Sequence, residues 1–301
     1  MTSVTFFGTP DFAVPALKAL IEAPFCRITL VVTQPDKPVG RHHSKAVPSP
    51  VKKVALEAGI DVISGVDSRG GLAASGESVH AASGVEAAEL GILVAYGEII
   101  PKELIDAFPL GILNIHPSLL PKYRGSSPMQ AAILNQDKET GATLMKLDDE
   151  MDHGPIVAQA KMSLRAKRSN LISALTAGEL HHALAQLGAE LLIKTLPDYI
   201  AGRVKPKPQD DSQASYTKKL TKEDGRIDWS KAIDEINAQV RAMNPWPGAW
   251  TSWRGKKLII WSIAKDGTPE EVQLEGRKRM PFEKFKRGHP DFKLTDFSSS
   301  R

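Results

Sequence analysis

The chain has 301 residues with a single cysteine, and its 39 Lys and Arg against 35 Asp and Glu give a formal net charge of +4. One cysteine excludes an internal disulfide and a zinc site built on several cysteines, and the length suffices for about two domains, each with its own core. The N-terminus lacks the basic and apolar regions of a signal peptide, and no apolar run approaches the ~20 residues of a membrane-spanning helix. We therefore expect a cytoplasmic protein without a membrane partner.

Short apolar runs alternate with helical stretches along the first half of the chain, which predicts an α/β fold with a parallel-rich twisted sheet. Ligands bind outside the carboxyl ends of the strands of such sheets. The loops after Ile115 and Leu147 are therefore expected to carry the chemistry. The expected strands are Val4–Phe7, Ile28–Thr33, Gly91–Ala95, Gly111–Ile115, Thr143–Leu147 and Ile156–Lys161. The expected helices are Ala13–Ala23, Val51–Gly59, Lys102–Phe108 and one or two between Asn170 and Ile200.

The last third of the chain differs from the rest in composition and charge. A segment rich in proline and charge at 203–214 predicts a linker between a domain at 1–202 and a small β-rich domain at 215–301. In the second domain we expect a helix that starts near Ile227 and ends near Met243, followed by short strands that include Leu258–Trp261.

The positive charge of the chain is concentrated in this last third. Counted on the sequence, residues 1–202 carry a net charge of −3 and residues 203–301 carry +7. A basic domain appended to a near-neutral one indicates a polyanionic partner such as nucleic acid, although a solvated lysine-rich surface accounts for the charge equally well.

The segment Gly8-Thr-Pro-Asp-Phe12 follows the first expected strand, where dinucleotide-binding proteins place a phosphate loop. It lacks the G-x-G-x-x-G pattern, and Pro10 has no N–H to donate to a phosphate. Dinucleotide binding is therefore disfavoured.

Asn114 and His116 are two residues apart at the end of an expected strand, so strand alternation points their side chains to the same face. An amide donor and a titratable base would then share one pocket, and Asp152 of the acidic loop 148–154 could add a carboxylate. Such a set suits the addition of an amine to a carbonyl, in which the amine loses a proton and an oxyanion needs a donor. The residues alone leave open a histidine that merely packs at a strand end.

One long motif is specific enough to suggest a family. Asn114-x-His116-Pro-Ser-Leu-Leu-Pro-x-Tyr-Arg-Gly125, followed by Pro128-x-Gln130 and Asp152-x-Gly154, resembles the signature of the folate-dependent formyltransferases. Phe7-Gly-Thr-Pro-Asp-Phe12, Arg226-Ile-Asp-Trp229 and Asn244-Pro-Trp-Pro247 resemble the branch of that family that acts on methionyl-tRNA.

The resemblance implies a Rossmann-like catalytic domain, followed by an OB-like domain that binds tRNA. It implies 10-formyltetrahydrofolate as co-substrate, initiator methionyl-tRNA as the acceptor for translation initiation, no metal, and a protein that can work as a monomer. Asn114, His116 and Asp152 would be catalytic. The implied folate-binding residues are Ser118, Leu119, Leu120, Pro121, Ala95, Tyr96, Gly97 and Asp148. The implied tRNA-binding residues are Arg41, Lys45 and Lys37, all in the basic loop 36–53.

The chain departs from the family pattern in its C-terminal domain. After Trp261 it soon reaches a closing segment, so the middle strands of an OB-like barrel are expected to be missing and the domain shortened. Two other functions stay open. A formyltransferase for an amino sugar nucleotide would keep the same trio but needs no basic loop, and a non-catalytic RNA-binding descendant would not need the trio at all.

Overall fold

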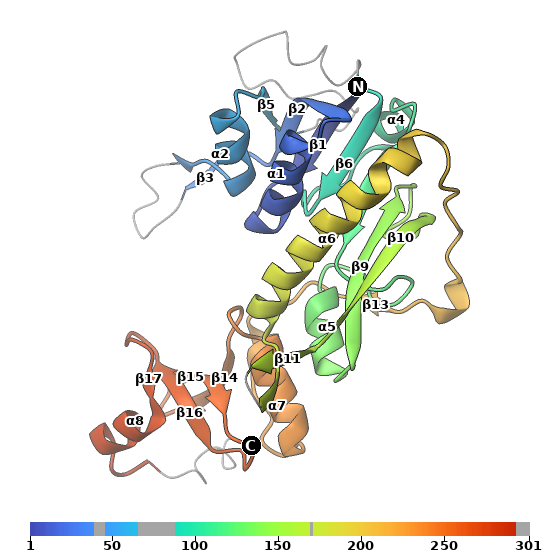
Figure 1. Ribbon diagram of the computed structural model, residues 1–301. Coiled ribbons are helices and arrows are strands. Elements are labelled where there is room, and N and C mark those ends of the chain that lie inside the picture. The colour runs from blue at the N-terminus through green and yellow to red at the C-terminus, as the bar shows by residue number, and fades with distance from the viewer. Residues whose placement is uncertain (39–45, 66–87, 169–170, 293–301) are drawn as a thin grey trace. The chain divides into compact units, whose positions relative to one another are not determined.

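The computed structural model describes residues 1–38, 46–65, 88–168 and 171–292 (Figure 1). The chain forms two compact units, each made of three stretches. The first unit comprises Met1–Arg124, Gly141–Lys161 and His182–Ser215, and the second comprises Gly125–Thr140, Met162–His181 and Tyr216–Arg301. Residues 203–214, which the sequence analysis assigns to a linker, thus group with the first unit. The domain limits drawn from the sequence stay a prediction.

Within the described residues, the main sheet has seven strands in the order β10-β9-β7-β6-β1-β2-β5. The pairs β1–β2, β1–β6, β2–β5 and β6–β7 are parallel, whereas β9 runs antiparallel to β7. The sheet confirms the expected parallel-rich α/β fold. Its strands are β1 (Thr2–Gly8), β2 (Cys26–Thr33), β5 (Val62–Ser64), β6 (Leu90–Val94), β7 (Ile112–His116), β9 (Glu139–Lys146) and β10 (Ile156–Ser163).

The helices of the first unit begin where the sequence offers start signals. Helix α1 has Pro15 in its first turn, and helix α2 starts after Ser49, whose hydroxyl accepts a hydrogen bond from the Lys52 N–H at 3.1 Å. Both helices pack against β2 (Figure 1). The bounds are η1 (Asp11–Ala13), α1 (Val14–Glu22), α2 (Pro50–Glu57), α4 (Lys102–Asp106) and η2 (Asp211–Gln213). Helix α6 (Ala177–Ile200) starts in the second unit and continues in the first from His182. Two short strands, β3 (Lys37–Pro38) and β4 (Ala46–Val47), pair with each other.

The stretch between Asn170 and Ile200 forms a strand and one helix. Helix α6 starts only at Ala177, whereas Leu171–Ala174 is strand β12, paired antiparallel with β11 (Arg165–Arg168). The apolar spacing from Leu171 onward fits a helix, but pairing with β11 satisfies the backbone of this segment as a hairpin instead.

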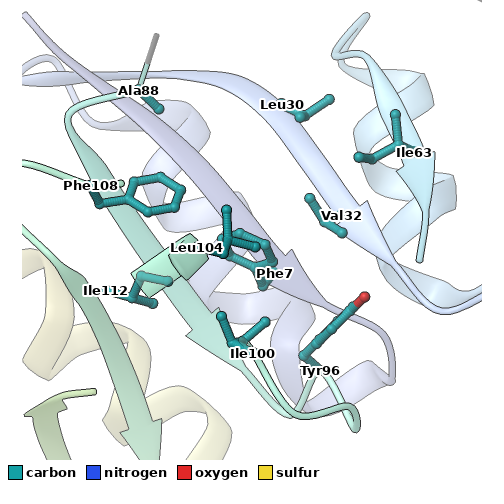
Figure 2. Close-up of a cluster of buried hydrophobic side chains, with 10 residues drawn as sticks. All are labelled: Phe7, Leu30, Val32, Ile63, Ala88, Tyr96, Ile100, Leu104, Phe108 and Ile112. Atoms are coloured by element: carbon teal, nitrogen blue, oxygen red, sulfur yellow. The ribbon is translucent and has the colours of Figure 1, made fainter. Parts of the chain in front are cut away.

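An aromatic cluster lies at the centre of one core of the first unit (Figure 2). The ring of Phe7 meets those of Tyr96 and Phe108 edge to face, with centroids 5.9 and 6.0 Å apart. Such pairs add to the free energy of burial. The other buried members of the cluster are Leu30, Val32, Ile63, Ala88, Ile100, Leu104 and Ile112. The cluster includes Phe7 of β1 and Ile112 of β7, and so helps to hold the strand that carries Asn114 and His116.

The second unit contains a four-stranded antiparallel sheet, in the order β14-β15-β16-β17, within its described residues. Helices α7 and α8 contact this sheet, and Trp253 of β14 contacts Phe285 of α8 and Phe292, which follows that helix. The small β-rich domain is confirmed, whereas its likeness to an OB barrel stays a prediction. The remaining elements are β8 (Arg124–Gly125), α5 (Pro128–Leu134), β13 (Tyr216–Thr217), η3 (Glu223–Gly225), α7 (Ile233–Ala242), β14 (Ala249–Trp253), β15 (Lys256–Ile263), β16 (Pro269–Leu274), β17 (Met280–Pro281) and α8 (Phe282–Gly288).

Among the helices that the structure describes, none combines the length and the apolar character that a membrane crossing demands.

We expect Phe7→Ala to lower the free energy of unfolding by about 3–5 kcal/mol, because it removes a ring from a cluster that excludes water and leaves a cavity. Phe7 is 0% exposed, whereas Leu56 is 57% exposed, so Leu56→Ala serves as the control and changes stability by less than about 0.5 kcal/mol. Urea denaturation measures both. Equal losses in the two variants would contradict the assignment of this core.

Candidate active site

Strand β7 presents two polar side chains among three isoleucine and leucine residues. Asn114 and His116 are 6% and 4% exposed, respectively. In the antiparallel register they lie opposite Met145 and Thr143 of β9. Because side chains alternate along a strand, the two residues share one face and are held by strands on both sides.

Asp152 reaches these side chains from the loop between β9 and β10. Its Oδ1 lies 3.4 Å from Nδ2 of Asn114, which donates to it, and 3.5 Å from Nδ1 of His116. The structure thus brings together the three residues that the sequence analysis singled out. One carboxylate oxygen faces both an amide donor and an imidazole nitrogen.

The opposite side of the His116 ring contacts a backbone carbonyl. Nε2 lies 2.9 Å from the carbonyl oxygen of Tyr123. Because a carbonyl oxygen only accepts hydrogen bonds, Nε2 carries the proton, and a neutral ring has its lone pair on Nδ1. That lone pair faces Asp152, so a proton accepted at Nδ1 places a positive charge 3.5 Å from a carboxylate oxygen.

The loop that supplies the Tyr123 carbonyl is braced by buried hydroxyls. Thr143 Oγ1 donates to the Ser118 carbonyl at 2.7 Å and accepts from the Leu120 N–H at 3.1 Å. Gln159 Nε2 donates to the Leu120 carbonyl at 2.8 Å, and Ser118 Oγ donates to the Lys122 carbonyl at 2.6 Å. These bonds hold the turn that ends at Tyr123, whose φ of +63° lies in the left-handed region.

The acidic loop has its own internal ion pair. His153 Nδ1 donates to Asp148 Oδ2 at 2.7 Å, and this hydrogen bond raises the pKa of His153 above its ordinary value of 6.5. Gly154 closes the loop, where an added Cβ would lie 1.9 Å from the Lys146 carbonyl oxygen. Only glycine fits this position, which explains the glycine two residues after Asp152.

The implied folate-binding residues divide into two groups by exposure. The side chains of Ser118, Leu120 and Tyr96 are buried within the protein, and the Tyr96 hydroxyl donates to Glu98 at 3.1 Å. The others are partly or well exposed: Leu119, Pro121, Ala95, Gly97 and Asp148. The buried side chains support the conformation of the loops that carry them.

The basic loop that the sequence analysis assigns to tRNA lies partly outside the described residues. Arg41 and Lys45 lie there, and of Lys37 the structure describes only the backbone, in β3. At the edge of the loop, Lys52 Nζ pairs with Asp36 Oδ2 at 2.8 Å.

Among the described residues, no group of three or more His, Cys, Asp or Glu side chains is arranged to hold a metal ion.

Comparison with known proteins shows the family to which the chain belongs. Residues 1–196 match the model of the family described as formyl transferase, and residues 219–271 match the formyl transferase C-terminal domain. The chain belongs to the formyl transferase family. A relative named methionyl-tRNA formyltransferase, from Heliobacterium modesticaldum, is 43% identical over 270 residues, which cover 88% of this chain and 80% of that protein.

Solved structures share the fold of this formyl transferase at low sequence identity. An N-formyltransferase from Helicobacter canadensis, in complex with folinic acid and dTDP-3-aminofucose, has a TM-score of 0.62 and 20% identity, and the match covers 93% of this chain and 99% of that one. Methionyl-tRNA formyltransferase from Clostridium thermocellum has a TM-score of 0.57 and 17% identity, with 93% and 100% covered. At such identities the likeness concerns the fold alone.

Sequence reasoning missed several groups that surround the trio in this formyl transferase. The Tyr123 carbonyl belongs to the backbone and carries no residue-type signal, and Thr143 and Gln159 sit on strands where they look like ordinary polar positions. Gln209 lies in the segment assigned to a linker, yet its Nε2 donates to the carbonyl oxygens of Asp152 and Gly154.

We expect Asp148→Asn to lower the pKa of His153 toward its ordinary value, because the carboxylate that holds the imidazolium is lost. A pKa raised by folding stabilises the folded state below pH 6.5, and this contribution is lost as the pH rises through the folded-state value. NMR titration of the His153 ring measures the shift. A titration curve that is the same in the wild type and in Asp148→Asn would contradict the ion pair.

Proposed function

We propose that this formyl transferase transfers a formyl group from 10-formyltetrahydrofolate to the free α-amino group of initiator methionyl-tRNA. The observation that carries the proposal is the shared oxygen of Asp152, which faces His116 Nδ1 and Asn114 Nδ2 within 3.5 Å. The relative at 43% identity, named methionyl-tRNA formyltransferase, supports this choice of acceptor.

Each residue of the trio has a distinct part in the proposed reaction. As the amine nitrogen forms its bond to the formyl carbon, negative charge develops on the formyl oxygen, and an N–H of Asn114 donates to that oxygen. His116 takes a proton from the amine at Nδ1 and returns one to the leaving nitrogen. The carboxylate of Asp152 stabilises the imidazolium between these two transfers and keeps the ring in place.

The folate co-substrate supplies the formyl group and leaves as tetrahydrofolate. The accessible residues beside the trio fit a flat, polar-edged pterin. Leu119 and Pro121 are apolar, while the backbones of Ala95 and Gly97 turn with φ of +48° and +88° and offer peptide groups. At Gly97 a Cβ would come within 2.5 Å of Gln34 Nε2, so a side chain there would displace Gln34.

The positive charge of the chain supports a tRNA acceptor over a small one. Residues 203–301 carry +7, and the loop 36–53 contains Lys37, Arg41 and Lys45, which we propose contact tRNA phosphates. An amino sugar nucleotide needs neither feature. A non-catalytic RNA-binding protein would have no use for a trio that meets within 3.5 Å.

Transfer of labelled formyl from 10-formyltetrahydrofolate tests the acceptor directly. With methionyl-tRNA and an amino sugar nucleotide offered together, we expect the label on methionyl-tRNA alone, because the basic surfaces favour the polyanion. Label on the sugar nucleotide alone would overturn the proposed acceptor. Formylation of initiator and elongator methionyl-tRNA at equal rates would overturn the specificity for the initiator.

We expect His116→Ala, Asn114→Ala and Asp152→Asn each to lower kcat by at least about 10²-fold without unfolding the protein, because each removes a group that acts on the developing charge or the moving proton. Single-turnover formylation and circular dichroism measure the two properties. Asp198→Asn is the control, since it removes a carboxylate from an exposed pair with Arg203 and leaves kcat unchanged. Activity near that of the wild type in His116→Ala would rule out the mechanism.

A further inference from the structure

We propose that Gln209 is a positioning residue that holds the Asp152 loop against β7, and that the buried guanidinium of Arg124 fixes the Gln209 carboxamide in the orientation this requires. The inference rests on the proposed function only in that it takes Asp152 to be catalytic. All the residues concerned belong to the first unit.

The Gln209 carboxamide makes hydrogen bonds on both of its ends. Nε2 donates to the carbonyl oxygen of Asp152 at 2.9 Å and to that of Gly154 at 2.8 Å. Oε1 accepts from Nε and Nη2 of Arg124 at 3.1 and 2.9 Å. One side chain thus bridges a buried cation and the backbone on both sides of His153.

The partners dictate which way the carboxamide points. A guanidinium only donates hydrogen bonds and a carbonyl oxygen only accepts them, so the oxygen of Gln209 must face Arg124 and the nitrogen must face the loop. Glutamate satisfies the first requirement and fails the second. Glutamine is the residue of this length that meets both.

The loop adopts a backbone conformation that needs such support. Asp152 has a φ of +50°, which L-residues rarely adopt, and Gly154 stands where no side chain fits. The two carbonyls that Gln209 holds belong to Asp152 itself and to Gly154. Holding the peptide groups on both sides of the turn fixes the direction in which the Asp152 side chain leaves the backbone.

Arg124 is anchored independently of Gln209. It is 1% exposed, and its Nη2 also donates to Asp211 Oδ1 at 2.7 Å, which lowers the pKa of that carboxyl below its ordinary value. The backbone N–H of Arg124 donates to the Ser215 carbonyl oxygen at 2.8 Å. The buried guanidinium therefore keeps the Asp211 carboxylate as a partner when Gln209 is replaced. A substitution at Gln209 thus reports the effect on the loop and not the cost of an unpaired buried charge.

The same segment also supports the other side of the trio. Ser215 Oγ accepts from the Tyr123 N–H at 2.9 Å, and the Tyr123 carbonyl holds Nε2 of His116. Gln209 and Ser215 thus hold the backbone on the two sides of the His116 ring, Gln209 at Asp152 and Ser215 at Tyr123.

The test uses Gln209→Glu in the full chain, with Gln213→Glu as the matched control. Gln209→Glu keeps an acceptor for Arg124 and removes both N–H donors to the loop. Gln213 is an exposed glutamine of the same segment whose Nε2 donates to Asp210. We expect Gln209→Glu to lower kcat for formylation of methionyl-tRNA by about tenfold or more while KM for both substrates stays within about twofold, because a displaced Asp152 affects the chemical step and not binding.

A second measurement needs neither substrate nor turnover. The ring ¹⁵N shifts of His116 report whether Asp152 still faces Nδ1, so we expect Gln209→Glu to change the Nδ1 shift and Gln213→Glu to leave it at the wild-type value. Urea denaturation checks that Gln209→Glu is folded. Gln209→Asn, which keeps both donor and acceptor on a shorter side chain, replaces it in all measurements if the glutamate variant does not fold.

Three results would overturn the proposal: wild-type kcat in the folded variant, a rise of KM with unchanged kcat, or His116 shifts identical to those of the wild type. If Gln209→Asn in turn loses activity only in proportion to its loss of folded protein, Gln209 has a structural role only, and that result also overturns the proposal. If the wild-type chain does not formylate methionyl-tRNA at all, the proposed function fails, and the His116 shifts still decide whether Gln209 positions Asp152.

Discussion

The site depends on one short-range arrangement, the approach of Asp152 Oδ1 to both His116 Nδ1 and Asn114 Nδ2 within 3.5 Å. Two of these side chains stand on a rigid strand, and the third comes from a loop. The strand supplies its pair by simple alternation, whereas the loop must be held in place by contacts from elsewhere. The geometry of the site therefore depends on the contacts that hold residues 148–154 in place.

The first unit meets this need by layering support around β7. Aromatic packing between Phe7, Tyr96 and Phe108 fixes the neighbouring strands, and Thr143 on β9 ties down the turn that leads to Tyr123. A buried cation, Arg124, then links this turn to the segment that carries Gln209. Apolar packing holds the sheet, and a few directional hydrogen bonds hold the loop 148–154 in a fixed position relative to it.

The sequence was sufficient for the sheet and for part of the site. Strands such as Val4–Phe7 and Ile28–Thr33 could be predicted because buried parallel strands are largely apolar runs. Asn114 and His116 could be placed on one face because residues two apart on a strand point the same way. The sequence could not predict that Asp152 reaches them, because this depends on how the loop between β9 and β10 folds back. The role of Gln209 could not be predicted because the prolines and charges around it suggest a linker, and its partners are backbone carbonyls. The hairpin β11–β12 could not be predicted because the apolar spacing from Leu171 onward also fits a helix.

The Tyr123 carbonyl and the Asp152 carboxylate face the two nitrogens of His116, which places the proton of the neutral ring on Nε2 and its lone pair on Nδ1. The most direct measurement is the ¹⁵N spectrum of the His116 ring at a pH where the ring is neutral. We expect the chemical shift of a protonated nitrogen at Nε2 and that of an unprotonated nitrogen at Nδ1. The opposite tautomer, with the proton on Nδ1, would rule out this assignment.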